Sequence, residues 1–86
     1  MAKALSSPPA YVITFSLTRP PNLGDRELIG LLRQAAHQAM CVEREITAHG
    51  MVVECVETAL SPLETALRVT FEAHGGRLES MRARRI

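Results

Sequence analysis

The sequence has no tryptophan and few aromatic side chains of any kind, which limits how its core can be built. Only Tyr11, Phe15 and Phe71 are aromatic among 86 residues. The interior must therefore rely on Leu, Val, Ile, Met and Ala, which gives a thin core for a chain of this length. A domain this small gains stability by burying further apolar surface against a second copy. The composition therefore favours a homodimer, or a complex with a larger protein.

Cysteines and long apolar runs are also scarce. Cys41 and Cys55 are the only cysteines, too few and too far apart for a disulfide framework. The sequence has no secretory signal and no apolar run of about 18 residues, which is what a membrane span requires. We therefore expect reduced thiols in a cytoplasmic protein with no membrane partner.

The composition is that of one folded domain. The hydrophobic fraction of 47% and the charged fraction of 22% are ordinary for a globular protein of 86 residues. Residues 1–9 end in two serines and two prolines, and paired prolines cannot join a strand ladder. Residues 1–9 are therefore predicted to be a flexible leader, and residues 10–86 a single domain.

The charge is nearly balanced overall but unevenly distributed. The formal net charge is +1, yet four arginines fall within the last ten residues. Arg82, Arg84 and Arg85 form a candidate basic patch, which either steers an anionic partner or ends a solvated strand. Nucleic acid is not expected as a partner, because the net charge is small and residues 51–57 offer no aromatic side chain for stacking bases.

Periodicity defines the first two elements. From Asp25 to Val42 apolar residues recur every three or four positions, which predicts an amphipathic helix capped by Asn22 or Asp25. Gly30 lies inside this helix at a cost of about 1 kcal/mol relative to Ala, so either a close contact requires it or the helix tolerates it. The preceding run, 11–18, alternates as in a half-buried strand, with one face formed by Tyr11, Ile13, Phe15 and Leu17.

Two short runs, 45–48 and 51–57, predict a β-hairpin. His49-Gly50 separates them, and glycine adopts the positive φ that a tight reversal needs. Both faces of the second run are partly apolar, which predicts a central strand with its second face covered by something outside the monomer. That second face carries Val52, Glu54 and Val56.

Residues 61–75 fit either a strand or a helix. Leu67, Val69 and Phe71 alternate with polar residues, as in a strand. Residues 61–64, Ser-Pro-Leu-Glu, form a capping box, and Gly75 is placed to supply a left-handed C-terminal cap. The helix features are more numerous, so we predict a helix. A strand here would instead give one helix on a longer meander.

The final run, 77–86, predicts an edge strand, because its arginines deter pairing with another sheet. Leu78 and Ser80 are expected on one face of this strand, with Glu79 and Met81 on the other.

The predicted order β-α-β-β-α-β is that of the ferredoxin-like α+β fold, an antiparallel sheet with two helices on one face. The first and third strands are central in this topology. Val12, Val52 and Val56 then become neighbours on the uncovered side of the sheet, and we predict them as interface residues.

No constellation of residues marks an active site. The three histidines, His37, His49 and His74, show no spacing that selects a catalytic set. His37 and Cys41 are one helical turn apart and can reach a single ion, but no second ligand pair is evident. We therefore predict no metal, no cofactor and no catalytic residue.

Residues 18–24, Thr-Arg-Pro-Pro-Asn-Leu-Gly, follow the first strand and precede the helix. Through Arg19, Pro20 and Leu23-Gly24 this segment resembles the Asp-Arg-Pro-Gly-Leu loop of ACT-type regulatory domains. The resemblance implies a domain of this topology that binds small effectors at a subunit interface near the loop. Amides at a helix N-terminus suit an anionic effector, so the candidate ligand-binding residues are Asn22, Leu23, Gly24 and Asp25.

Three functional hypotheses follow. The leading one is a non-enzymatic binding or regulatory module that acts through protein–protein contact as a homodimer. The second is a small enzyme or enzyme subunit whose site forms between protomers around His37, Cys41 or His49. The third is a protein inhibitor of a larger partner, suggested by the acidic middle and basic end of the chain. The fold does not decide among them.

Overall fold

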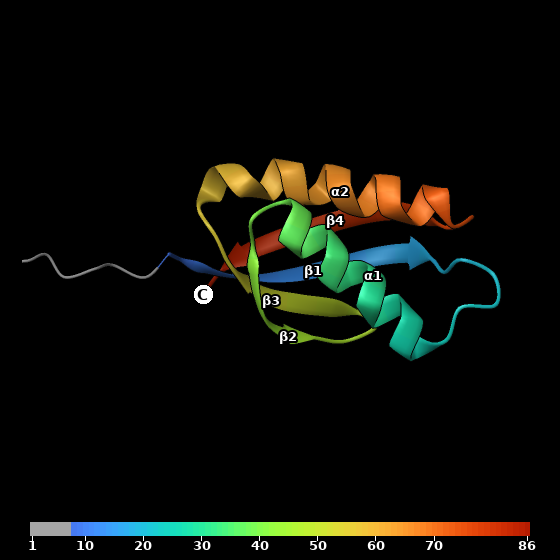
Figure 1. Cartoon of the computed structure of the whole chain (residues 1–86). Helices are drawn as coiled ribbons and strands as arrows, with labels where there is room; N and C mark the ends of the chain where they lie inside the picture. The colour runs from blue at the N-terminus through green and yellow to red at the C-terminus, as the bar shows by residue number, and fades with distance from the viewer. Residues whose placement is uncertain (1–7) are drawn as a thin grey trace, which may run out of the picture.

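The computed structural model describes residues 8–86, so most of the predicted leader lies outside it. The elements follow the predicted order β-α-β-β-α-β (Figure 1), with one turn of 3₁₀ helix at Glu57–Ala59. Their bounds are β1 Ala10–Thr18, α1 Asp25–Gln38, β2 Val42–Ile46, β3 Gly50–Glu54, α2 Leu60–Ala73 and β4 Arg77–Arg85.

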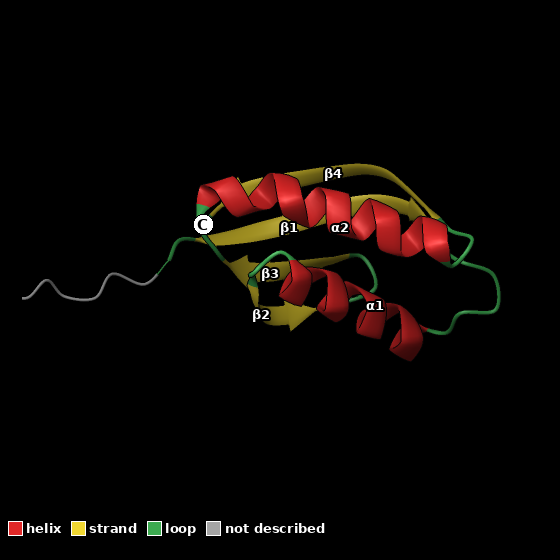
Figure 2. Cartoon of the chain, turned by 45° about the horizontal axis from the view of Figure 1, so that its top comes forward, coloured by secondary structure: helices red, strands yellow, loops and turns green. Residues whose placement is uncertain are grey.

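The four strands form one antiparallel sheet in the order β2-β3-β1-β4, with β1 and β3 central as predicted. Both helices lie on the same face of this sheet, as Figure 2 shows. The protein therefore has the ferredoxin-like α+β fold, and the second face of the sheet carries no element of residues 8–86. No helix in this part of the chain is long and apolar enough to cross a membrane.

The core lies between the helices and the sheet. Alternate residues of the central strands point into it, and the apolar stripe of each helix covers them. The largest side chains with almost no exposed surface are Ile13, Leu28, Leu32, Val53, Leu63, Leu67, Phe71 and Leu78. With one exception these are aliphatic, as the shortage of aromatic residues predicts.

The helix predicted over residues 61–75 is confirmed as α2, but its start was predicted wrongly. The N-cap is Ala59, and Ser61 lies inside the first turn without a capping hydrogen bond. The 3₁₀ turn at Glu57–Ala59 already has helical backbone geometry and leads directly into α2. A side-chain cap at Ser61 therefore has no role.

The C-terminal end of α2 follows the prediction. Gly75 has φ +85°, in the left-handed region. The Gly76 N–H donates to the Phe71 carbonyl oxygen (2.8 Å), and the Gly75 N–H donates to that of Glu72 (3.2 Å). This pair of bonds is the Schellman motif.

α1 begins at Asp25 as predicted, but its N-cap and its C-terminal end differ from the prediction. The N-cap is Gly24, not Asn22 or Asp25, and the helix ends at Gln38 rather than Val42. Met40 takes the left-handed conformation with φ 61°. The N–H groups of Met40 and Cys41 then donate to the carbonyl oxygens of His37 and Ala36 (3.1 and 2.8 Å), which repeats the motif that ends α2.

The hairpin strands are β2 and β3, not residues 45–48 and 51–57. Their turn is held by Thr47, whose Oγ1 accepts from the N–H groups of His49 and Gly50 and donates to the Gly50 carbonyl oxygen (3.2 Å each). Gly50 does not have positive φ. A Cβ there would lie 2.5 Å from the Ile13 carbonyl oxygen, so close packing against β1 explains this glycine.

A bulge corrects the alternation predicted for β4. The register between β1 and β4 shifts where Ser16 pairs with Ser80 and Leu17 with Leu78. Leu78 is consequently buried while Ser80 is exposed, so these two residues do not share a face.

Candidate functional site

The candidate site is the face of the sheet that the helices do not cover, here called the open face. Tyr11 and Ile13 of β1 are buried beneath the helices, so Val12 between them points to the open face. Val52 of β3 is directly paired with Val12. The predicted contact between these two valines is therefore present at the centre of the sheet, and both are only partly buried.

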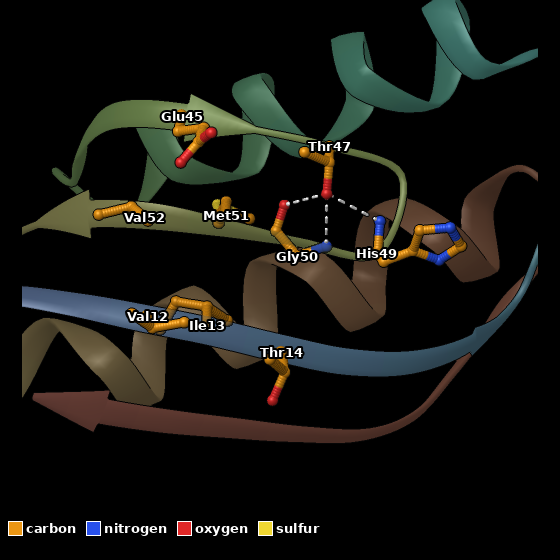
Figure 3. Close-up of a pocket in the computed structure, with 9 residues that line it drawn as sticks. All are labelled: Val12, Ile13, Thr14, Glu45, Thr47, His49, Gly50, Met51 and Val52. Carbon is orange, nitrogen blue, oxygen red and sulfur yellow. Dashed lines mark hydrogen bonds between the residues drawn. The ribbon is translucent and has the colours of Figure 1, made fainter.

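Charged and hydroxyl side chains surround the two valines. Figure 3 shows Glu45 of β2, Val52 and Val12 on three neighbouring strands, seen from the open face. They line a shallow depression of about 280 Å³ together with Thr14 and Thr47. A second depression, of about 320 Å³, is lined by Val12, Thr14, Arg82 and Arg84.

Some charges on the open face are neutralised within the chain, and others are not. Arg44 pairs with Glu54, and Arg77 pairs with Glu79 at 3.8 Å. Three charged side chains of this face have no ion-pair partner among residues 8–86: Glu45, Arg82 and Arg84. The unpaired acid lies on β2 and the unpaired arginines on β4, at opposite edges of the sheet.

Two predicted residues lie apart from this group. Val56 follows the end of β3 and leads into the 3₁₀ turn, with 59% of its surface exposed. Arg85 is paired with Tyr11, whose side chain points to the helix face, so alternation separates Arg85 from Arg82 and Arg84. The predicted interface and basic patch are each only partly assembled on one surface.

Sequence inspection missed Glu45. The register between β2 and β3 shifts between Glu43 and Glu45, where Arg44 forms a bulge. Glu43 consequently turns towards α1, where it meets Arg33 (2.9 Å) and His37 (3.0 Å). Glu43 and Glu45 are two residues apart and would share a face in a regular strand, but the bulge places them on opposite faces. No residue type in this segment predicts a bulge.

The predicted ligand loop is folded around an internal ion pair. Arg19 contacts Asp25 (2.7 Å), and its Nη1 donates to the Leu23 carbonyl oxygen (3.5 Å). Asn22 has φ 62°, in the left-handed region, and Gly24 is the N-cap of α1. The four residues 22–25 are thus neighbours at one end of the molecule, beyond the end of β1 (Figure 1).

The start of α1 already carries negative charge. Asp25 and Glu27 both lie in its first turn, and Glu27 Oε1 lies 2.8 Å from where a Cβ on Gly24 would be. Carboxylates at this position stabilise the helix dipole. An anionic effector would have to approach these two carboxylates.

The candidate catalytic groups do not converge. His37 is exposed beside Glu43, His49 is exposed in the hairpin turn, and Cys41 is buried. His74 is placed by a hydrogen bond between its Nδ1 and the Thr70 carbonyl oxygen (2.9 Å). Within residues 8–86 there is no group of three or more His, Cys, Asp or Glu side chains that can hold a metal ion.

The two cysteines are free thiols in the core. Burial raises the pKa of Cys41 from its ordinary value of 9.0 to about 12, and the neighbouring Cys55 adds to this effect. Because the thiolate is the reactive form, this raised pKa keeps Cys41 protonated and poorly nucleophilic at neutral pH.

Comparisons of the chain with protein-family models, with curated proteins and with solved structures found no match. The similarity of residues 18–24 to an ACT-type loop stays a prediction from the sequence.

Proposed function

We propose that this chain is a non-enzymatic binding module that acts through protein–protein contact and forms a homodimer through its open face. The observation that carries the proposal is the pair Val12 and Val52, which lie side by side at the centre of a sheet face that residues 8–86 leave uncovered. Apolar surface in the middle of a polar rim is the usual anatomy of an interface between proteins.

The small core gives a second reason. One aromatic residue, Phe71, is fully buried, and the rest of the fully buried set is aliphatic. Covering Val12 and Val52 with a second sheet would bury both faces of this sheet. Each Å² of apolar surface removed from water would stabilise the dimer by about 25 cal/mol.

A regulatory role is implied only by the resemblance of residues 18–24 to the ACT-type loop. Asp25 and Glu27 oppose an anion at the start of α1. We therefore propose that the chain functions through protein–protein contact at its open face. Binding of an anionic effector at residues 22–25 is not part of this proposal.

The test is light scattering coupled to size exclusion on wild type and two variants, at low and high salt. Val52→Glu places a charge at the centre of the open face, whereas Val69→Glu makes the same change on α2, where Val69 is 61% exposed. We expect wild type and Val69→Glu to be dimers and Val52→Glu to be a monomer. Circular dichroism confirms that each variant is folded.

A monomeric wild type at every concentration would refute the homodimer. A folded Val52→Glu variant that remains dimeric would place the interface elsewhere on the molecule.

A further inference from the structure

Four residues, one from each strand, lie in a single row across the open face. Glu45 of β2 is paired with Val52 of β3, and Val52 is paired with Val12 of β1. Val12 is paired in turn with Arg84 of β4. Directly opposed residues of antiparallel strands share a face. The row therefore runs acid, valine, valine, arginine, with unlike charges at its two ends.

The charged ends of this row cannot neutralise each other within one molecule. Three strand spacings separate β2 from β4, which amounts to about 14 Å. Neither Glu45 nor Arg84 takes part in any ion pair among residues 8–86. The open face therefore carries an apolar centre between a free carboxylate on one side and a free guanidinium on the other.

A second copy of the same face satisfies this pattern in one orientation. Two sheets that pack face to face keep their strands within about 30° of each other. A two-fold axis parallel to the strands reverses the row, so that Glu45 meets Arg84 of the second copy and Val52 meets Val12. A two-fold axis along the row, perpendicular to the strands, instead places Glu45 opposite Glu45 and Arg84 opposite Arg84. Like charges facing each other across an interface are unfavourable.

We propose that the open face binds a second copy of this chain about a two-fold axis parallel to the strands, with two Glu45–Arg84 contacts flanking a core of Val12 and Val52. This inference rests on the homodimer proposed above and adds its orientation. Symmetry makes each contact occur twice.

An adjacent row supports the same orientation independently. Val42 is paired with Glu54, and Glu54 is paired with Ala10. The N–H of Ile86 donates to the Ala10 carbonyl oxygen (3.0 Å), which extends this row to the edge of β4. Val42 and Ile86 are among the most exposed large apolar residues, at 62% and 74%. The parallel two-fold axis brings Val42 of one copy to Ile86 of the other, so both are covered.

The test is a charge-swap cycle followed by sedimentation, because the two orientations respond differently to it. Glu45→Arg or Arg84→Glu alone creates two like-charge contacts in the proposed dimer and should weaken association about tenfold or more. The double variant Glu45→Arg/Arg84→Glu reverses the row and recreates both contacts, so it should dimerise to within about threefold of wild type. In the perpendicular orientation the double variant would not dimerise more tightly than wild type or than the single variants.

Matched controls are available on the helix side of the molecule. Glu72→Arg and Arg26→Glu make the same changes in net charge at exposed positions of α2 and α1, neither of which has an ion-pair partner among residues 8–86. These two variants should dimerise like wild type. Circular dichroism is recorded for every variant to confirm the fold.

The outcomes separate this inference from the proposed function. If Val52→Glu dissociates the dimer but the double variant is as weak as the single variants, the open face is the interface and the orientation is wrong. The same conclusion holds if neither single variant weakens the dimer. A monomeric wild type refutes the homodimer and the orientation together.

Discussion

Gly30 lies on the exposed side of α1, in surroundings that have room for a methyl group. A Cβ built at this position would have no heavy atom within 4 Å. The sequence left open whether a close contact requires this glycine, and the structure shows that none does. Glycine in a helix interior costs up to about 1 kcal/mol relative to alanine because its unfolded backbone has more freedom to lose.

We therefore expect Gly30→Ala to raise the free energy of unfolding by about 1 kcal/mol in urea titrations. The contrasting variant is Gly50→Ala, whose Cβ would lie 2.5 Å from the Ile13 carbonyl oxygen. That variant should lose about 2 kcal/mol, because β3 must move away from β1 to accommodate it. Equal effects at the two positions would contradict this account of the glycines.

Cys41 makes stability depend on alkaline pH. Its pKa is about 12 in the folded protein against 9.0 ordinarily, because burial disfavours the thiolate. Between these values the unfolded chain has lost the thiol proton and the folded chain has kept it, so the unfolded state binds fewer protons. Stability therefore falls as pH rises above about 9, by about 1 kcal/mol for each pH unit.

The measurement is urea unfolding of wild type and Cys41→Ala between pH 8 and about pH 11. The alanine variant starts less stable because it leaves a cavity, but its stability should decline less steeply with pH. Parallel curves for the two proteins would show that Cys41 does not contribute to the pH dependence.

At the scale of the elements, the two helices end in the same hydrogen-bond motif with different residues in its left-handed position. α2 uses Gly75, whereas α1 uses Met40, which is 84% exposed. A side chain with a Cβ is strained there by roughly 1 kcal/mol or more, and glycine is not.

Met40→Gly should therefore stabilise the protein by about 1 kcal/mol, whereas Gly75→Ala should destabilise it by a similar amount. Ser61→Ala is the companion variant at the other end of α2. Because Ser61 makes no capping hydrogen bond, Ser61→Ala should change the free energy of unfolding by less than about 0.5 kcal/mol. Replacing a true N-cap residue by alanine would lower it by more. Thermal and urea unfolding of the three variants check these values. A loss of stability in Met40→Gly would mean that the side chain has a packing role.

Helix ends and strand bounds also mark the limit of what the sequence predicts. The element order and the central strands followed from periodicity. The helical character of α2 followed from its end signals, of which the Gly75 cap is confirmed and the capping box at Ser61 is not. The end of α1 did not follow from the sequence, because methionine at position 40 is a good helix former and gives no sign of stopping. The bulges at Arg44 and opposite Ser16 were not predicted for a related reason. A bulge changes the alternation of a strand without requiring a special residue type.

At the scale of the whole molecule, the candidate site was predicted in its centre and not at its edges. Val12 and Val52 alternate with core residues, so their position on the open face followed from the pattern alone. Glu45 and Arg84 can be recognised as candidate interface residues only from the register of the four strands. That register places them at the two ends of one row. Register depends on bulges as well as on turns, and the bulges of β2 and β4 were not predicted from the sequence.

A homodimer built on this face links the stability of the whole molecule to its concentration. When folding and association are coupled, a tenfold increase in protein concentration adds about 1.4 kcal/mol to the stability of each dimer. For two chains of 86 residues this corresponds to a rise of about 4 °C in Tm. We expect this rise for wild type and for Val69→Glu in calorimetry, but not for Val52→Glu. A wild-type Tm that is independent of concentration would mean that the open face is uncovered in the folded protein, and its valines would then serve a different partner.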